Sequence, residues 1–120
     1  MRKEAQNWFN QAEDDFDGAE FNYRGEKYYI AAFLCQQAFE KALKALLINE
    51  TASFPKVHDL TRLARLARAP KDIITLCSKI NPGYTASRYP DLPQQYFKED
   101  CEELLADAKV ILKWIKAKLD

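Results

Sequence analysis

The residues from Tyr28 to Ile48 read YYIAAFLCQQAFEKALKALLI, and this stretch decides the fold. It contains no glycine or proline, is rich in strong helix formers and lacks the alternation of a strand, so it predicts one long helix. At about 100° per residue, its polar side chains fall within an arc of roughly 140°, and we call them the polar strip: Gln36, Gln37, Glu40, Lys41 and Lys44. The remaining circumference is apolar, which is wider than the stripe of a surface helix. The helix is therefore either central to a bundle or covered on one side by a second copy of the chain.

Length and composition limit the class of protein. A chain of 120 residues is long enough for one core, so we expect a single domain over residues 1–120. Lys plus Arg and Asp plus Glu are both 18, and a net charge of zero gives no general attraction to nucleic acid or anionic membrane. No apolar run approaches the roughly 20 residues of a membrane span, and the first residues lack the apolar core of a signal peptide. The sequence therefore predicts a cytoplasmic protein with no membrane segment.

The cysteines are Cys35, Cys77 and Cys101. They are far apart, odd in number, and each lies in an apolar helical pattern. This arrangement favours small buried hydrophobic residues in a reducing compartment over disulfides. A zinc site is not expected either, because there is no close CxxC pair.

Apolar residues at helical spacing recur along the chain, and nothing reads as a strand. Gly25 ends the first helix and makes a short link, so the first two helices should be antiparallel neighbours. Asn81-Pro82-Gly83 is expected to end a later helix, and residues 82–94 are expected to form a loop. The sequence thus predicts an all-α, up-and-down bundle of four to five helices. The expected helices are residues 3–23, 28–48, 58–67, 70–80 and 95–119.

Several kinds of chemistry are absent from the sequence. No glycine-rich phosphate loop and no HExxH motif is present. His58 is the only histidine, so neither a histidine-based metal site nor a cofactor is predicted. A serine or cysteine nucleophile would need His58 as its base, and no pattern places one beside it.

Two motifs together resemble the HEPN domain family. The run from Ala31 to Leu46, AAFLCQQAFEKALKAL, is followed by His58-Asp59-Leu60 with Leu63, and the amino-terminal helix carries Trp8 and Asp14-Asp15. The resemblance covers essentially the whole chain. It implies a homodimer through the long helices and, in prokaryotic members, pairing with a minimal nucleotidyltransferase in a toxin–antitoxin system. Some members of the family are similar to small-nucleotide binders.

The sequence departs from the pattern of the ribonucleases in that family. Those proteins carry an arginine followed four to six residues later by a histidine, and none of the six arginines here has such a histidine. The usual acid–base mechanism is therefore not carried over, and no catalytic residue is assigned. His58 matches the family's HDL position, where its structural role would be to help start the third helix; the alternative is a role in ligand binding.

The stretch PGYTASRYPDLPQ, residues 82–94, is the main candidate for a ligand site. Its Ser-Arg-Tyr-Pro-Asp string resembles the loop of a HEPN subgroup without the downstream histidine. Arg88 offers a bidentate donor for phosphate, Tyr84 and Tyr89 offer faces for stacking on a base, and Asp91 could accept from a ribose hydroxyl. In the alternative, Arg88 and Asp91 pair with each other and the tyrosines plug the end of the bundle.

The polar strip provides the remaining candidates. Glu40 and Lys44 are four residues apart, and their ion pair alone explains their presence. If the strip faces a dimer cleft, Gln37 and Lys41 would also contact a nucleotide.

We therefore expect a HEPN-domain accessory or toxin-like subunit that works with a minimal nucleotidyltransferase and has a nucleotide-binding cleft. Two alternatives remain open. One is an RNA-cleaving toxin that uses Arg88 without the usual histidine, with Tyr89, Asp91 or the distant His58 as its proton-transfer partner. The other is a purely structural dimerisation module.

Overall fold

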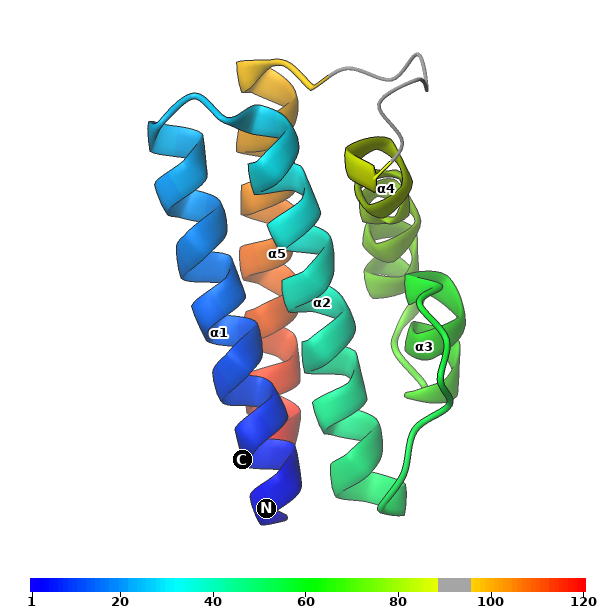
Figure 1. Ribbon diagram of the computed structural model, residues 1–120. Coiled ribbons are helices and arrows are strands. Elements are labelled where there is room, and N and C mark those ends of the chain that lie inside the picture. The colour runs from blue at the N-terminus through cyan, green and yellow to red at the C-terminus, as the bar shows by residue number, and fades with distance from the viewer. Residues whose placement is uncertain (89–95) are drawn as a thin grey trace.

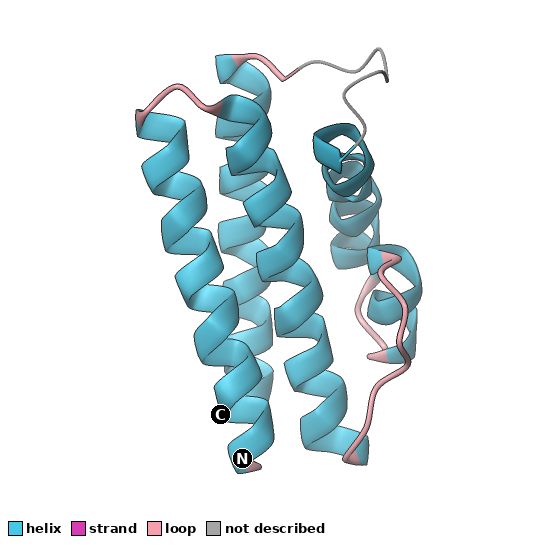
Figure 2. Cartoon of the chain, in the orientation of Figure 1, coloured by secondary structure: helices cyan, strands magenta, loops and turns pink. Residues whose placement is uncertain are grey.

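The computed structural model describes the backbone of residues 1–88 and 96–120 and the side chains of residues 1–81 and 96–120. In Figure 1 the four long helices run alternately up and down, the short helix α3 packs beside α4, and both termini lie at the same end. Within these residues there is no strand (Figure 2), so the predicted all-α bundle is confirmed. The helices are α1 (Lys3–Arg24), α2 (Tyr28–Thr51), α3 (Leu60–Leu66), α4 (Lys71–Arg88) and α5 (Lys98–Leu119).

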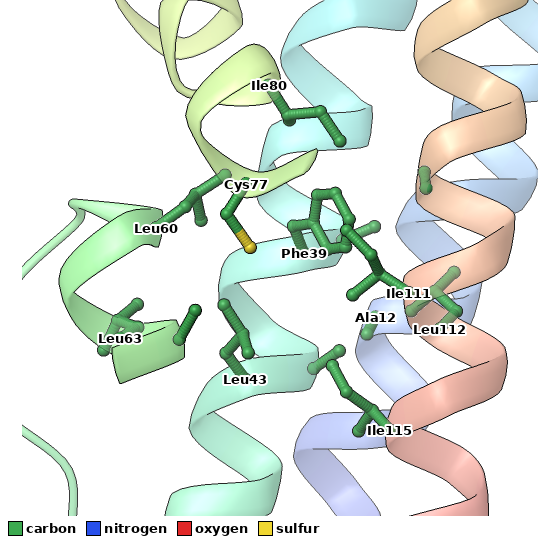
Figure 3. Close-up of a cluster of buried hydrophobic side chains, with 14 of the residues drawn as sticks. Ala12, Phe39, Leu43, Leu60, Leu63, Cys77, Ile80, Ile111, Leu112 and Ile115 are labelled. Carbon is green, nitrogen blue, oxygen red and sulfur yellow. The ribbon is translucent and has the colours of Figure 1, made fainter. Parts of the chain in front are cut away.

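Helix α2 is the centre of the bundle. It packs against each of the other four helices, and 14 of its residues between Ala31 and Ile48 are buried. Figure 3 shows Phe39 and Leu43 of α2 among side chains of α3, α4 and α5. Of the two interpretations of its wide apolar surface, the central position is the one confirmed. A second copy of the chain is not needed to cover it.

The predicted end of α4 is wrong. The helix was expected to stop at Asn81-Pro82-Gly83, but it continues to Arg88, so residues 82–88 are helical and not part of a loop. Pro82 removes one backbone donor from α4, but the fixed φ of a proline is compatible with a helix, so the helix can pass through this position. The Asn81 side chain does not end α4; its amide bonds to the start of α3.

The end of α2 also lies further along the chain than predicted. The polar residues from Asn49 to Thr51 continue the helix. The Thr51 hydroxyl donates to the carbonyl of Leu47 over 2.9 Å, which satisfies one acceptor of the last turn. The helix stops at Ala52, whose φ of 67° is left-handed.

The three cysteines are free and buried, as predicted. Burial raises the pKa of the Cys35 and Cys77 thiols to about 12 and that of Cys101 to about 11. These thiols therefore stay protonated at neutral pH and do not act as nucleophiles. Among the helices that the structure describes, none has the length and apolarity that crossing a membrane requires.

Candidate functional site

The polar strip of α2 is largely enclosed by the chain itself. Gln36 is 0% exposed, and Glu40 and Lys44 are each 5% exposed. These three residues are therefore covered by the chain itself, and a ligand contact of Gln37 and Lys41 stays a prediction. Gln37 and Lys41 remain partly exposed at the edge of the strip.

Glu40 lies at the centre of the hydrogen-bond network of the strip. Its carboxylate accepts hydrogen bonds from Lys44 Nζ at 2.8 Å, from His58 Nδ1 at 2.8 Å and from Gln36 Nε2 at 3.1 Å. Gln37 Nε2 extends the network by donating to Gln36 Oε1 over 2.8 Å. Burial alone would raise the pKa of Glu40, but the bonds from Lys44, His58 and Gln36 outweigh it and lower the pKa. Glu40 is therefore ionised at neutral pH.

Two aromatic rings cover the Lys44 ammonium. Its Nζ lies 5.9 Å from the ring centroid of Trp8 and 5.0 Å from that of Phe54. The two rings meet edge to face, with centroids 4.9 Å apart. Trp8 comes from α1 and Phe54 from the connection between α2 and α3, so both segments close over the strip. The ammonium thus exchanges water for one carboxylate and two ring faces.

His58 is positioned by the start of α3. Asp59, not His58, caps this helix, because its Oδ1 accepts from the backbone N–H groups of Thr61 at 3.0 Å and Arg62 at 3.4 Å. Asn81 of α4 braces the turn by accepting from the Leu60 N–H over 2.8 Å. With the turn fixed, the His58 ring reaches Glu40 while 59% of its side chain is exposed.

The contact between His58 and Glu40 fixes the tautomer of the imidazole. An ionised carboxylate can only accept, so Nδ1 of His58 carries the proton that Glu40 receives. A carboxylate that orients an exposed histidine in this way is an arrangement suited to proton transfer or to phosphate binding.

Lys41 lies at the other edge of the strip. Its Nζ pairs with Asp15 Oδ2 of α1 at 2.7 Å. The side chain of Asp15 is only 13% exposed. Lys41 also lines a shallow depression together with Asn7, Trp8 and Gln11. A cation beside an indole ring and two amides offers groups that bind phosphate and stack on a base.

The residues predicted from the 82–94 stretch are only partly placed. Tyr84 and Arg88 belong to the last turns of α4, and their side chains lie outside the described residues. Tyr89 and Asp91 lie outside them entirely. A ligand role for these four residues therefore stays a prediction.

Sequence reasoning missed how Glu40 and Lys44 connect to the rest of the site. Their spacing predicted the pair, which is confirmed at 2.8 Å. Their burial was indicated by the apolar residues around them, which predicted either a central helix or cover by a second copy of the chain. The bond to His58, eighteen residues away, leaves no periodic pattern in the sequence.

The fold and the strip define a class: an all-α bundle whose central helix carries an enclosed polar network. Among the described residues, no group of three or more His, Cys, Asp or Glu side chains is placed to hold a metal ion. The model of the HEPN domain family matches residues 5–118. The chain therefore belongs to the HEPN domain family, which confirms the resemblance seen in the sequence.

Two solved structures share the fold over the full chain. The archaeal HEPN homologue ST0689 is 32% identical, covers 100% of each chain and gives a TM-score of 0.84. The protein TT1696 from Thermus thermophilus is 28% identical, covers 98% of this chain and 100% of its own, and gives a TM-score of 0.89. No curated protein matches this chain.

Proposed function

We propose that this HEPN-domain protein is an accessory or toxin-like subunit that works with a minimal nucleotidyltransferase, and that it binds a nucleotide at the exposed edge of the polar strip. Membership of the family supports the partnership. The observation that carries the nucleotide site is the placement of Lys41 and Trp8 around one depression, beside a network that includes the exposed ring of His58. We further propose that residues 1–120 act as a single cytoplasmic domain and form a homodimer.

Lys41 supplies the phosphate contact at this depression, and Arg88, at the end of α4, is a second and separate candidate for a phosphate contact. Tyr84, Tyr89 and Asp91 are the proposal's further candidates, for the base and the ribose. Gln37 is held by Gln36 and presents the remaining amide of the strip. A nucleotide phosphate would compete with Asp15 for the Lys41 ammonium. On binding, Lys41 would contact the phosphate either together with Asp15 or in place of it.

Thermal unfolding against a panel of nucleotides and short RNAs tests the site. A ligand at about 100 times its dissociation constant should raise the free energy of unfolding of the wild-type protein by roughly 2.7 kcal/mol. Lys41→Ala should abolish this ligand-induced shift, because it removes the phosphate contact of the depression. Loss of the shift in Arg88→Ala instead would place the nucleotide at the end of α4. Lys71→Ala, an exposed lysine at the start of α4, is the matched control and should keep it. The ligand-induced shift is the readout because Lys41→Ala also removes the ion pair with Asp15.

Two outcomes would contradict the site. An equal shift in wild type and in Lys41→Ala would move binding away from the strip. No shift with any nucleotide or RNA would remove nucleotide binding from the proposal. If Arg88→Ala then changed stability alone, the purely structural module would be the better account.

A second function, RNA cleavage, is favoured by one specific observation. Glu40 accepts a hydrogen bond from the Nδ1–H of His58, so a buried carboxylate orients an exposed imidazole. In this candidate function, His58 is the group that transfers a proton during RNA cleavage. The guanidinium of Arg88 stabilises the negative charge on the phosphate. General acid–base catalysis of this type contributes roughly 100- to 10,000-fold.

Cleavage of a labelled short RNA in the presence of EDTA tests the second function. The wild-type protein should cut, and His58→Ala and Arg88→Ala should each slow cutting by roughly 100-fold or more. Lys56→Ala, an exposed neighbour on the same connection, should cut at the wild-type rate. Cutting that persists unchanged in His58→Ala would show that this histidine is not the proton-transfer group.

A further inference from the structure

A polar depression of about 510 Å³ lies where three helices end. Helices α2 and α5 finish at the end of the bundle that carries both termini (Figure 1), and the last turn of α3 completes the lining. The lining residues are Glu50, Thr51, Leu66, Ala67, Arg68 and Lys118. None of them lines the depression that contains Lys41. The depression is therefore a separate candidate for a binding site.

Two of the lining residues are cations, Arg68 after the end of α3 and Lys118 in the last turn of α5. The φ of Arg68 is 57°, which is left-handed, and its N–H closes α3 by donating to the Arg65 carbonyl over 3.0 Å. Glycine adopts this conformation without strain, whereas an arginine does not, so the backbone gives no reason for an arginine here. The Lys118 ammonium lies 6.0 Å from the ring centroid of Trp114. Both side chains can donate hydrogen bonds to an anionic group.

The last turn of α2 contributes acceptors to the same depression. Glu50 supplies a carboxylate. The hydroxyl of Thr51 already donates its one proton, because its Oγ1 lies 2.9 Å from the Leu47 carbonyl oxygen and 2.9 Å from that of Ser53. Towards a further group this oxygen can therefore only accept. The negative end of the α2 dipole lies at the same turn, so this side of the depression favours a cation.

The charges of the depression do not neutralise one another by direct contact. Within the part of the chain that the structure describes, Glu50, Arg68 and Lys118 form no ion pair within 4.0 Å. A simple anion would be repelled by Glu50, and a simple cation would be repelled by Arg68 and Lys118. A ligand that carries both an anionic group and an ammonium group has the complementary pattern. Leu66, 49% exposed, adds an apolar contact beside these charges.

We propose that this depression binds a free α-amino acid with an apolar side chain. The carboxylate of the ligand accepts from Arg68 and Lys118, and its ammonium donates to Glu50 and Thr51. Its side chain packs on Leu66. The inference goes beyond the proposed function and depends neither on the nucleotide nor on a partner protein. Because the charged groups of the depression are exposed to water, we expect a dissociation constant in the millimolar range.

Titration of the full chain with L-leucine, followed by the NMR shifts of the backbone amides, tests the proposal. Saturable shifts should be largest at Thr51, Ala67 and Arg68, which line the depression. Two analogues each remove one charge of the ligand: isocaproate lacks the ammonium, and isopentylamine lacks the carboxylate. Each should bind roughly 5-fold more weakly than leucine or worse, because it loses the contacts of one side and meets a like charge there.

Two variants test the two sides of the depression. Arg68→Gly removes the guanidinium and suits a φ of 57°, so it should weaken leucine binding roughly 5-fold without lowering the midpoint of thermal unfolding. Glu50→Gln keeps the size of the side chain but removes its charge, and it should weaken binding by a similar factor. Arg65→Ala and Lys116→Ala are the matched controls. Both remove an exposed cation that does not line the depression, so both should bind leucine as the wild type does.

Three results would overturn the proposal. The absence of any saturable shift with leucine at millimolar concentrations would exclude an amino-acid site. Equal binding of leucine and isocaproate, or tighter binding in Glu50→Gln, would show that the depression takes a simple anion and that the ammonium contact is wrong. Unchanged leucine binding in Arg68→Gly would place the ligand outside this depression.

Discussion

Glu40→Ala lowers the free energy of unfolding by about 3 to 5 kcal/mol, one of the two largest losses expected for a single substitution in this chain. The reason is that this substitution removes the carboxylate and leaves the Lys44 ammonium in place. Lys44 is 5% exposed and enclosed by Trp8 and Phe54, so without Glu40 its ammonium is a buried charge with no counter-charge. Urea unfolding followed by circular dichroism at pH 7 measures the loss.

Two further variants show whether the orphaned charge is the cause. Glu50→Ala removes an exposed glutamate from the same helix and should change stability by about 0.5 kcal/mol or less. A double variant, Glu40→Met with Lys44→Met, removes both charges and keeps similar volume, so its stability should return to within about 1 kcal/mol of wild type. A double variant as unstable as Glu40→Ala would contradict this explanation.

The same contact gives stability a pH dependence of known sign. The pKa of Glu40 is lower in the folded chain than its ordinary value, so the folded state favours the ionised form. The contribution is present above the ordinary glutamate pKa of about 4.3 and is lost as the pH falls through the lowered pKa of the folded state. The difference between wild type and Glu40→Ala should therefore narrow in acid.

Phe39→Ala is the second large effect, with an expected loss of about 3 to 5 kcal/mol. Phe39 is 0% exposed and lies in the cluster where α2 meets α4 and α5, beside Ile111 (Figure 3). Removing the ring loses buried apolar area and leaves a cavity that the surrounding helices cannot close without shifting. The midpoint and slope of urea unfolding measure the change in free energy.

Phe21 provides the matched control for Phe39. It is the same residue type in a long helix, but it is 69% exposed. Phe21→Ala should therefore change the free energy of unfolding by about 0.5 kcal/mol or less. Comparable losses in the two variants would mean that Phe21 is covered in solution, and the exposure of that end of the bundle would need to be revised.

Most of the fold follows from periodicity in the sequence. The all-round apolar surface of the Tyr28 stretch placed α2 at the centre, because a helix so apolar must be buried on most sides. Local signals were weaker at helix ends. The Pro82-Gly83 pair is a strong breaker by propensity, yet α4 passes through it, so local preference did not decide where this helix ends.

The site was harder to predict than the fold. Lys44 and Glu40 were recognised as a pair because their spacing is regular, but His58 and Trp8 join them from distant parts of the chain. No periodicity links positions 8, 44 and 58, so only the packed structure brings them together. The HDL motif did point to this region, although Asp59 rather than His58 turned out to cap the helix.

The shortness of α3 has a consequence for the order in which the molecule assembles. Seven residues form too short a helix to persist alone, since isolated helices below about 12 residues are marginal in water. Its first N–H group is bonded to Asn81, so α4 stabilises the start of α3. We therefore expect α3 and the turn that carries His58 to fold after the long helices and to unfold before them. Brief local unfolding should release the imidazole from Glu40 while the four long helices remain folded.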